Sequence, residues 1–147
     1  GVYQADLVEK IATVLMKLGS RKALVVCGEG NMDEITITGK TDIAETADGK
    51  VKTYTITPED LGVTPASLED LKGGATPEES ASQITQILNG TPGAKLEMTV
   101  CNAGAALYAA GAGNAKDLRS GVELAREVIS SGKALAKLNG LVDFCKK

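Results

Sequence analysis

The chain has 147 residues, enough for one domain that can bury roughly 70% of its unfolded surface. Its net charge is −3 and 3% of its residues are aromatic, so it offers neither a basic nucleic-acid surface nor stacking platforms for bases. Its apolar runs are far shorter than a membrane span, and its lack of histidine excludes Ser-His-Asp catalysis, Cys-His catalysis and His metal ligation within this chain.

The first half of the chain is predicted to form a helix, a buried strand and a hairpin. Apolar residues recur at helical spacing over 4–18, and Gly19 follows as a stop. A strand is predicted over 22–27, because 23–27 is a continuous apolar run rich in β-branched residues, which is typical of a strand buried on both faces of a parallel sheet. A short alternating stretch covers 35–38. Asp48-Gly49 favours a type I′ turn, so we expect an antiparallel hairpin from 41–45 and 51–56.

The second half is predicted to be helical. Thr57-Pro58 begins one helical turn that Gly62 ends, and 63–75 reads as surface loop. Thr76 and Glu79 form a predicted capping box for a helix to Asn89. A helix over 93–110 is apolar on most sides and rich in small residues, so it is expected to be central and closely packed. Helices at about 115–130 and 132–145 are expected to cover the sheet. Each of three helices has an expected apolar face. For the helix that ends at Asn89 it is Ala81, Ile84 and Leu88; for 115–130 it is Leu118, Val122, Ala125 and Ile129; and for 132–145 it is Leu135, Leu138, Val142 and Cys145.

The residues that point most directly to a function follow the buried strand. The segment 28–31 has the small, flexible residues of a tight loop, and Asp33 and Glu34 come directly after it. Ligands of open α/β sheets bind just past the carboxyl ends of parallel strands. Paired carboxylates there suit Mg²⁺, which usually takes one or two protein carboxylates and keeps phosphate or water ligands. The alternative is a solvated acidic turn. Gly28 and Gly30 are interpreted as letting the backbone turn so that the two acids face the edge of the sheet.

Other polar and sulfur-containing residues are interpreted as structural. Cys27, Cys101 and Cys145 lack metal-ligand spacing, and we read the first two as small buried hydrophobes, consistent with a reducing cytoplasm. Asn102 is a candidate hydrogen-bond partner for a loop. Tyr108, six residues later on the same predicted helix, is expected to pack rather than to catalyse.

Four segments resemble, in order, parts of the anthranilate phosphoribosyltransferase family. Residues 21–35 resemble its second metal-site segment, and 1–3 before a helix resemble its mid-chain joint. Residues 102–108 resemble its late small-residue helix, and 121–135 its C-terminal helix pair. The resemblance covers nearly the whole chain but only the C-terminal part of that enzyme. Cys27 stands where the family often has His, and Asn31-Met32 replaces a Gly-Leu pair.

The resemblance implies an α/β fold, namely the C-terminal portion of a nucleoside phosphorylase/phosphoribosyltransferase-like α/β domain with a parallel strand plus an antiparallel hairpin covered by helices. Residues 1–147 would be the C-terminal segment of the catalytic domain, without the N-terminal helical domain and pyrophosphate loop. The implied reaction transfers a phosphoribosyl group from phosphoribosyl pyrophosphate to anthranilate in tryptophan biosynthesis. Asp33 and Glu34 would supply the second acidic pair that binds Mg²⁺.

The implied partners are those two substrates in the complete enzyme, the remaining N-terminal part of the same protein, and a further copy in a homo-oligomer, with no nucleic acid and no membrane. Because the family's Gly-rich pyrophosphate loop and Lys-His-Gly-Asn segment are missing here, this chain alone is expected to be inactive. Two alternatives stay open: a fragment of a pyrimidine nucleoside phosphorylase-like enzyme, or a non-catalytic binding or assembly module. Sequence upstream of Gly1 would separate the three.

Overall fold

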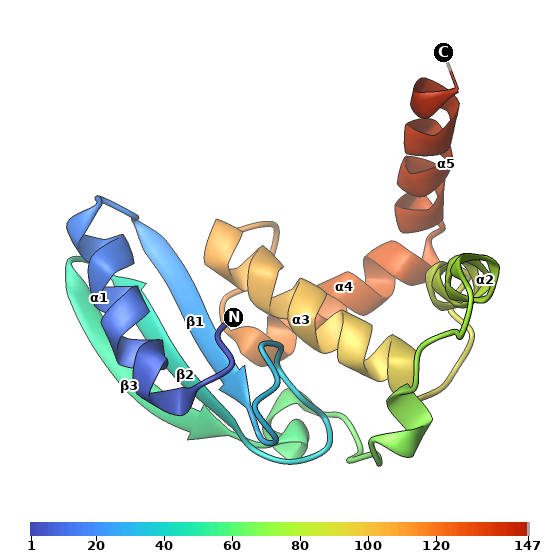
Figure 1. Ribbon diagram of the computed structural model, residues 1–147. Helices are drawn as coiled ribbons and strands as arrows, with labels where there is room; N and C mark the ends of the chain where they lie inside the picture. The colour runs from blue at the N-terminus through green and yellow to red at the C-terminus, as the bar shows by residue number, and fades with distance from the viewer. Residues whose placement is uncertain (147) are drawn as a thin grey trace.

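The computed structural model describes residues 1–146, which form a three-stranded sheet with helices on both faces (Figure 1). Short 3₁₀ turns at Ala5–Leu7, Pro58–Leu61 and Glu69–Leu71 join the longer elements. In chain order these are α1 (Val8–Lys17), β1 (Lys22–Gly28), β2 (Thr41–Ala47), β3 (Lys50–Ile56), α2 (Pro77–Leu88), α3 (Ala94–Ala110), α4 (Leu118–Ser130) and α5 (Lys133–Cys145). No helix in the described part of the chain is long and apolar enough to cross a membrane.

The sheet confirms the predicted hairpin and α/β class. Its strand order is β1-β2-β3, and both neighbouring pairs are antiparallel. Asp48 and Gly49 have φ values of 50° and 70°, the positive values that a type I′ turn requires. Among the described residues, however, no strand pairs with β1 in the expected parallel direction. The reason is the connection between β1 and β2: the Glu29 N–H donates to the Lys40 carbonyl at 2.8 Å, so the chain doubles back beside β1 instead of crossing over the sheet.

Both faces of β1 are buried, as its continuous apolar run predicts. Val25 and Cys27 pack with Ala44 of β2 under Val8 and Ala12 of α1. Because successive side chains of a strand point to opposite faces, Val26 lies on the other side. There it joins the larger core, which includes Ile35, Ile37, Ile43, Val100, Cys101, Val122 and Ile129.

The larger core depends on a close crossing of α3 and α4. A Cβ added at Gly104 would overlap the backbone of Gly121 and Val122, and one added at Gly121 would overlap the backbone of Gly104. This confirms that the small residues of α3 allow a neighbouring backbone to approach. On the rim of the crossing, the Arg126 guanidinium donates to both carboxylate oxygens of Glu97, at 2.9 and 2.7 Å.

The two remaining helices correct the predicted packing. Neither α2 nor α5 has a buried residue. Ala81 and Ile84 of the expected α2 stripe are exposed, and α5 contacts α4 and α2 rather than the sheet. Figure 1 shows α5 projecting from the body of the molecule. The expectation that it covers the sheet is therefore wrong. Periodicity identified an apolar face, but a face is buried only where another element meets it.

The helix start predicted at Thr76 is found, with one difference in capping. Thr76 caps α2, since its hydroxyl accepts from the Glu79 N–H at 3.1 Å. The Glu79 carboxylate accepts from the N–H of Ala75 rather than from that of Thr76, so the reciprocal half of the predicted box is not made. A complete box occurs at the 3₁₀ turn Pro58–Leu61, between Thr57 and Asp60.

Candidate metal centre

The loop after β1 begins with a tight, backbone-bonded turn. Gly28 and Met32 form an antiparallel bridge: the Gly28 N–H donates to the Met32 carbonyl at 2.7 Å, and the Met32 N–H returns a bond at 3.1 Å. Gly30 and Asn31 take positive φ values of 81° and 63°, which close the turn. Gly28 is needed for a different reason, because a Cβ there would lie 2.8 Å from the Glu34 carbonyl oxygen. The turn therefore delivers Asp33 and Glu34 directly beyond the end of β1.

The far side of the acidic pair is fixed by α3. The Ile35 N–H donates to Asn102 Oδ1 at 2.9 Å, and Asn102 Nδ2 donates to the Ile35 carbonyl at 2.9 Å. The expected hydrogen bond between Asn102 and a loop is thus confirmed. Ile35 and Ile37 are buried in the larger core, and the Thr36 N–H donates to Thr41 Oγ1 at 3.1 Å. The segment 35–38, which alternates in the sequence, is an irregular buried segment rather than a strand.

Asp33 and Glu34 are exposed between these two anchors and affect each other electrostatically. The pKa of Glu34 is raised, first by partial burial and then by the neighbouring Asp33 carboxylate. A cation between the two carboxylates would relieve this repulsion. Across residues 1–146 no cluster of three or more His, Cys, Asp or Glu side chains is placed to hold a metal. The pair fits Mg²⁺ that carries phosphate or water in its remaining positions, and it does not form a complete protein cage.

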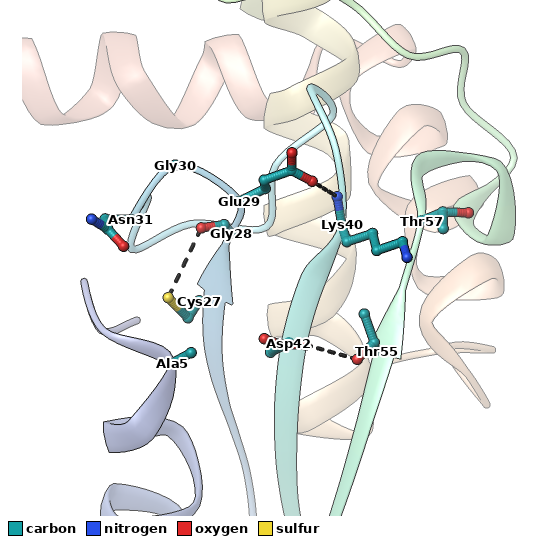
Figure 2. A pocket seen from close by; sticks show the side chains of 10 residues that line it. All are labelled: Ala5, Cys27, Gly28, Glu29, Gly30, Asn31, Lys40, Asp42, Thr55 and Thr57. Atoms are coloured by element: carbon teal, nitrogen blue, oxygen red, sulfur yellow. Dashed lines mark hydrogen bonds between the residues drawn. The ribbon is translucent and has the colours of Figure 1, made fainter.

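The loop separates two hollows in the surface. Glu34 lines a groove of about 540 Å³ together with Lys95, Thr99 and Asn102 on one face of α3. The start of the loop lines another hollow, of about 560 Å³, on the side of Ala5 (Figure 2). Figure 2 shows Asp42 accepting from Thr55 in this second hollow, at 2.7 Å. Glu34 therefore lies on the α3 side of the sheet, a placement that sequence spacing did not predict.

The cysteines contribute no nucleophile to this region. Burial raises the pKa of the Cys27 thiol, and the nearby Asp42 carboxylate raises it further. Burial also raises the pKa of Cys101 to about 12. Both thiols stay protonated at neutral pH, and the prediction that they act as small buried hydrophobes is confirmed.

A second polar cluster lies at the opposite end of β1. The hydroxyls of Tyr54 and Tyr108 donate to the two oxygens of Glu45, at 2.9 and 2.8 Å. Lys22 Nζ lies 3.6 Å from Glu45 and 3.0 Å from the centroid of the Tyr108 ring. Tyr108 thus joins α3 to the sheet. No sequence pattern predicts this cluster, because its members come from four separate elements.

A match over nearly the whole chain identifies its family. The family described as "Glycosyl transferase family, a/b domain" matches residues 1–135, so the chain belongs to this family. Within it, the chain is similar to anthranilate phosphoribosyltransferases. The protein of that name from Desulfotalea psychrophila is 50% identical over 144 residues, which are 98% of this chain and 41% of the relative. The one from Methanosarcina barkeri is 47% identical over 98% of this chain and 38% of its own length.

Solved structures agree with this assignment. The anthranilate phosphoribosyltransferase of Thermus thermophilus superposes with a TM-score of 0.88 at 38% identity, over 100% of this chain and 42% of that one. The Saccharomyces cerevisiae enzyme in complex with phosphoribosyl pyrophosphate and Mg has a TM-score of 0.80 at 23% identity, over 97% of this chain and 41% of its own, and so shares the fold. The chain spans about two fifths of the length of the relatives it matches.

Proposed function

We propose that this chain is a segment of an anthranilate phosphoribosyltransferase, which transfers a phosphoribosyl group from phosphoribosyl pyrophosphate to anthranilate. The observation that carries the proposal is the acidic pair Asp33-Glu34, anchored on both sides at the end of a buried strand. It occurs in a chain that is 50% identical to a relative with that name. No described residue of this chain is assigned as a nucleophile or as the acceptor site.

The reaction needs charge neutralisation on the departing pyrophosphate and positioning of the attacking amine, and not a covalent nucleophile. Mg²⁺ supplies the first of these when it is bound. Asp33 and Glu34 would hold it, directly or through water, beside the groove that Glu34 lines. Support comes from the raised pKa of Glu34, caused first by partial burial and then by the Asp33 carboxylate beside it, and from the Mg present in the yeast enzyme of the same fold.

We further propose that the rest of the parent protein covers surface that this chain leaves open. Among the described residues β1 has one strand neighbour, β2. On its other edge the Val26 carbonyl accepts from the Val2 N–H at 2.9 Å and Gly28 bridges Met32, so the first half of that edge has no described strand beside it. Large apolar side chains are exposed on α2 and α5, including Ile84, Leu141 and Phe144. The complete enzyme is proposed to be a cytoplasmic homo-oligomer. The isolated chain should self-associate, so sedimentation at micromolar concentration should show species larger than the 15.1 kDa monomer. A clean monomer would contradict this.

The first test compares the isolated chain with the full-length parent. Anthranilate is fluorescent, and its fluorescence should stay constant when the 147-residue chain is mixed with phosphoribosyl pyrophosphate and Mg²⁺. The full-length parent should consume it. Turnover proportional to the concentration of the isolated chain would contradict the proposal that the pyrophosphate and acceptor sites lie elsewhere in the parent.

The second test asks whether the acidic pair binds the metal. In the full-length parent, Asp33→Asn or Glu34→Gln should lower the rate about 10²–10³-fold, because loss of one electrostatic element typically costs about 2–4 kcal/mol in the transition state. The melting temperature should hardly change, since both side chains are exposed. The matched control is Asp48→Asn in the hairpin turn at the other end of the sheet. Near-native rates at every Mg²⁺ concentration would refute the assignment.

A further inference from the structure

The side-chain amide of Asn102 makes three hydrogen bonds, and two of them go to the loop residue directly after Glu34. Oδ1 accepts from the Ile35 N–H, and Nδ2 donates to the Ile35 carbonyl, both at 2.9 Å. The second Nδ2 hydrogen goes to the Met98 carbonyl one helical turn back, at 3.0 Å. Both peptide groups of one loop residue are thus tied to α3 by a residue 67 positions away in the sequence.

This arrangement fixes the amide in one orientation. The oxygen must face the Ile35 N–H, because an amide NH₂ cannot accept from it, and the nitrogen has two hydrogens for two carbonyls. An aspartate would lose both donors, and a serine would be too short to reach Ile35. Both Oδ1 and Nδ2 of Asn102 therefore have protein partners. The side chain fixes the loop and is not itself a metal ligand.

The two anchors of the acidic pair differ in kind. The upstream anchor, between Gly28 and Met32, uses only backbone groups. The downstream anchor depends on the identity of one side chain. Asn102 also lines the same groove as Glu34, so the contact lies at the candidate site itself. A change at Asn102 would remove both hydrogen bonds to the Ile35 backbone and leave the carboxyl-terminal end of the Asp33-Glu34 pair held by the buried Ile35 side chain and the Thr36 bond to Thr41. The amino-terminal end would stay bridged to β1.

We propose that Asn102 is a positioning residue that sets the separation and direction of the Asp33 and Glu34 carboxylates for Mg²⁺. The inference rests on the proposed function, because it assigns Asn102 to the metal pair named there. It adds a helix residue outside the loop that acts through the Ile35 backbone and touches neither metal nor substrate. Residues that orient metal ligands from outside typically change metal affinity or activity by about 10–100-fold when they are replaced.

The test uses the full-length parent with Asn102→Ser and Asn102→Ala. Serine can still donate to the Met98 carbonyl, so it keeps the bond within α3 and removes only those to Ile35. We expect faster amide hydrogen exchange in the segment 33–37 for both variants. Calorimetric titration with Mg²⁺ in the presence of phosphoribosyl pyrophosphate should show about tenfold weaker Mg²⁺ binding. The Mg²⁺ concentration for half-maximal rate should rise by the same factor.

The control is Arg126→Met, which breaks the ion pair with Glu97 between α3 and α4 and leaves the loop bonds intact. It should lower the melting temperature without changing Mg²⁺ affinity. If the Asn102 variants bind Mg²⁺ as the control does while Asp33→Asn binds it more weakly, the positioning role is wrong and the metal pair stands. If Asp33→Asn leaves Mg²⁺ binding unchanged, the metal site fails and the role of Asn102 fails with it. Unchanged exchange at 33–37 in Asn102→Ser would also refute the positioning role.

Discussion

Helices α4 and α5 are neighbours in the chain, each has 13 residues, and each shows an apolar stripe in the sequence. In the fold they differ sharply. α4 buries Gly121, Val122, Ala125 and Ile129 against α3, whereas α5 buries none of its residues. The difference comes from what faces each helix. α4 packs against a helix whose small residues allow a close approach, whereas α5 contacts α4 and α2 without burying any of its residues.

The inner core of α3 and α4 holds the acidic loop, whereas the outer helices α2 and α5 bury none of their own residues. Asn102 and Gly104 lie on the same helix, α3, so the loop is held by an element that is itself fixed by α4. Substitutions in the inner core should therefore change stability strongly. Matched substitutions on α5 should change it little, unless the parent protein covers that helix.

The largest expected contrast is between Ile129→Ala and Leu141→Ala. Ile129 is 7% exposed and Leu141 is 58% exposed. Removing the buried side chain should lower the free energy of unfolding by about 3 kcal/mol, because it loses apolar contacts and leaves a cavity. The exposed one should cost less than about 0.5 kcal/mol. Urea unfolding of both variants of the full-length parent measures this. A large loss in Leu141→Ala would show that α5 is buried in the parent.

The next contrast uses two helical glycines. Gly104→Ala should destabilise the protein by about 2 kcal/mol, because the new Cβ forces the α3 and α4 backbones apart. Gly140→Ala in α5 has nothing within 4 Å of the new Cβ. It should stabilise the protein by about 0.5–1 kcal/mol, because alanine restricts the unfolded chain. Thermal melts that shift in the same direction for both variants would contradict the proposed close crossing.

A smaller effect is expected from the ion pair at the rim of the α3–α4 crossing. The side chains of Arg126 and Glu97 are 42% and 26% exposed, so solvent weakens their attraction. Arg126→Met should lower the free energy of unfolding by about 0.5–1 kcal/mol, and the loss should shrink in high salt. A loss that does not depend on salt would point to packing of the arginine stem instead.

The smallest expected effect concerns pH. The folded-state pKa of Glu34 lies above its ordinary value of 4.5, so the folded state binds the proton more tightly than the unfolded state. The contribution of Glu34 to stability is therefore favourable below that ordinary value and is lost as the pH rises through the raised pKa. Glu34→Gln should raise the melting temperature slightly more at pH 7 than at pH 4. Equal shifts at both pH values would contradict the raised pKa.

Local features of the fold were largely predictable from the sequence. The turn at Asp48-Gly49, the start of α2 at Thr76 and the buried strand β1 all follow from short-range patterns. Packing partners were not predictable in the same way. The apolar residues of α5 mark a face, but nothing in their spacing says whether another element meets it. Nor does the spacing reveal that Gly104 crosses Gly121.

The candidate site shows the same division. Asp33 and Glu34 stood out because they follow a buried strand and a glycine turn, a local signal. The partner of Asn102 could be predicted only as a loop, because the bond to Ile35 joins residues 67 positions apart. The groove that Glu34 shares with Lys95 and Thr99 had no signal at all, since it forms only when α3 docks beside the loop.

The distribution of thiols gives the protein a built-in reporter. Cys27 and Cys101 are buried and protonated at neutral pH, whereas Cys145 is exposed near the end of α5. A thiol-reactive dye should therefore attach to the folded chain at Cys145 alone, and to all three sites once urea unfolds it. The labelling rate of Cys145 then tells whether another surface shelters α5. Slow labelling in the full-length parent beside fast labelling in the isolated chain would locate part of the missing contact at this helix.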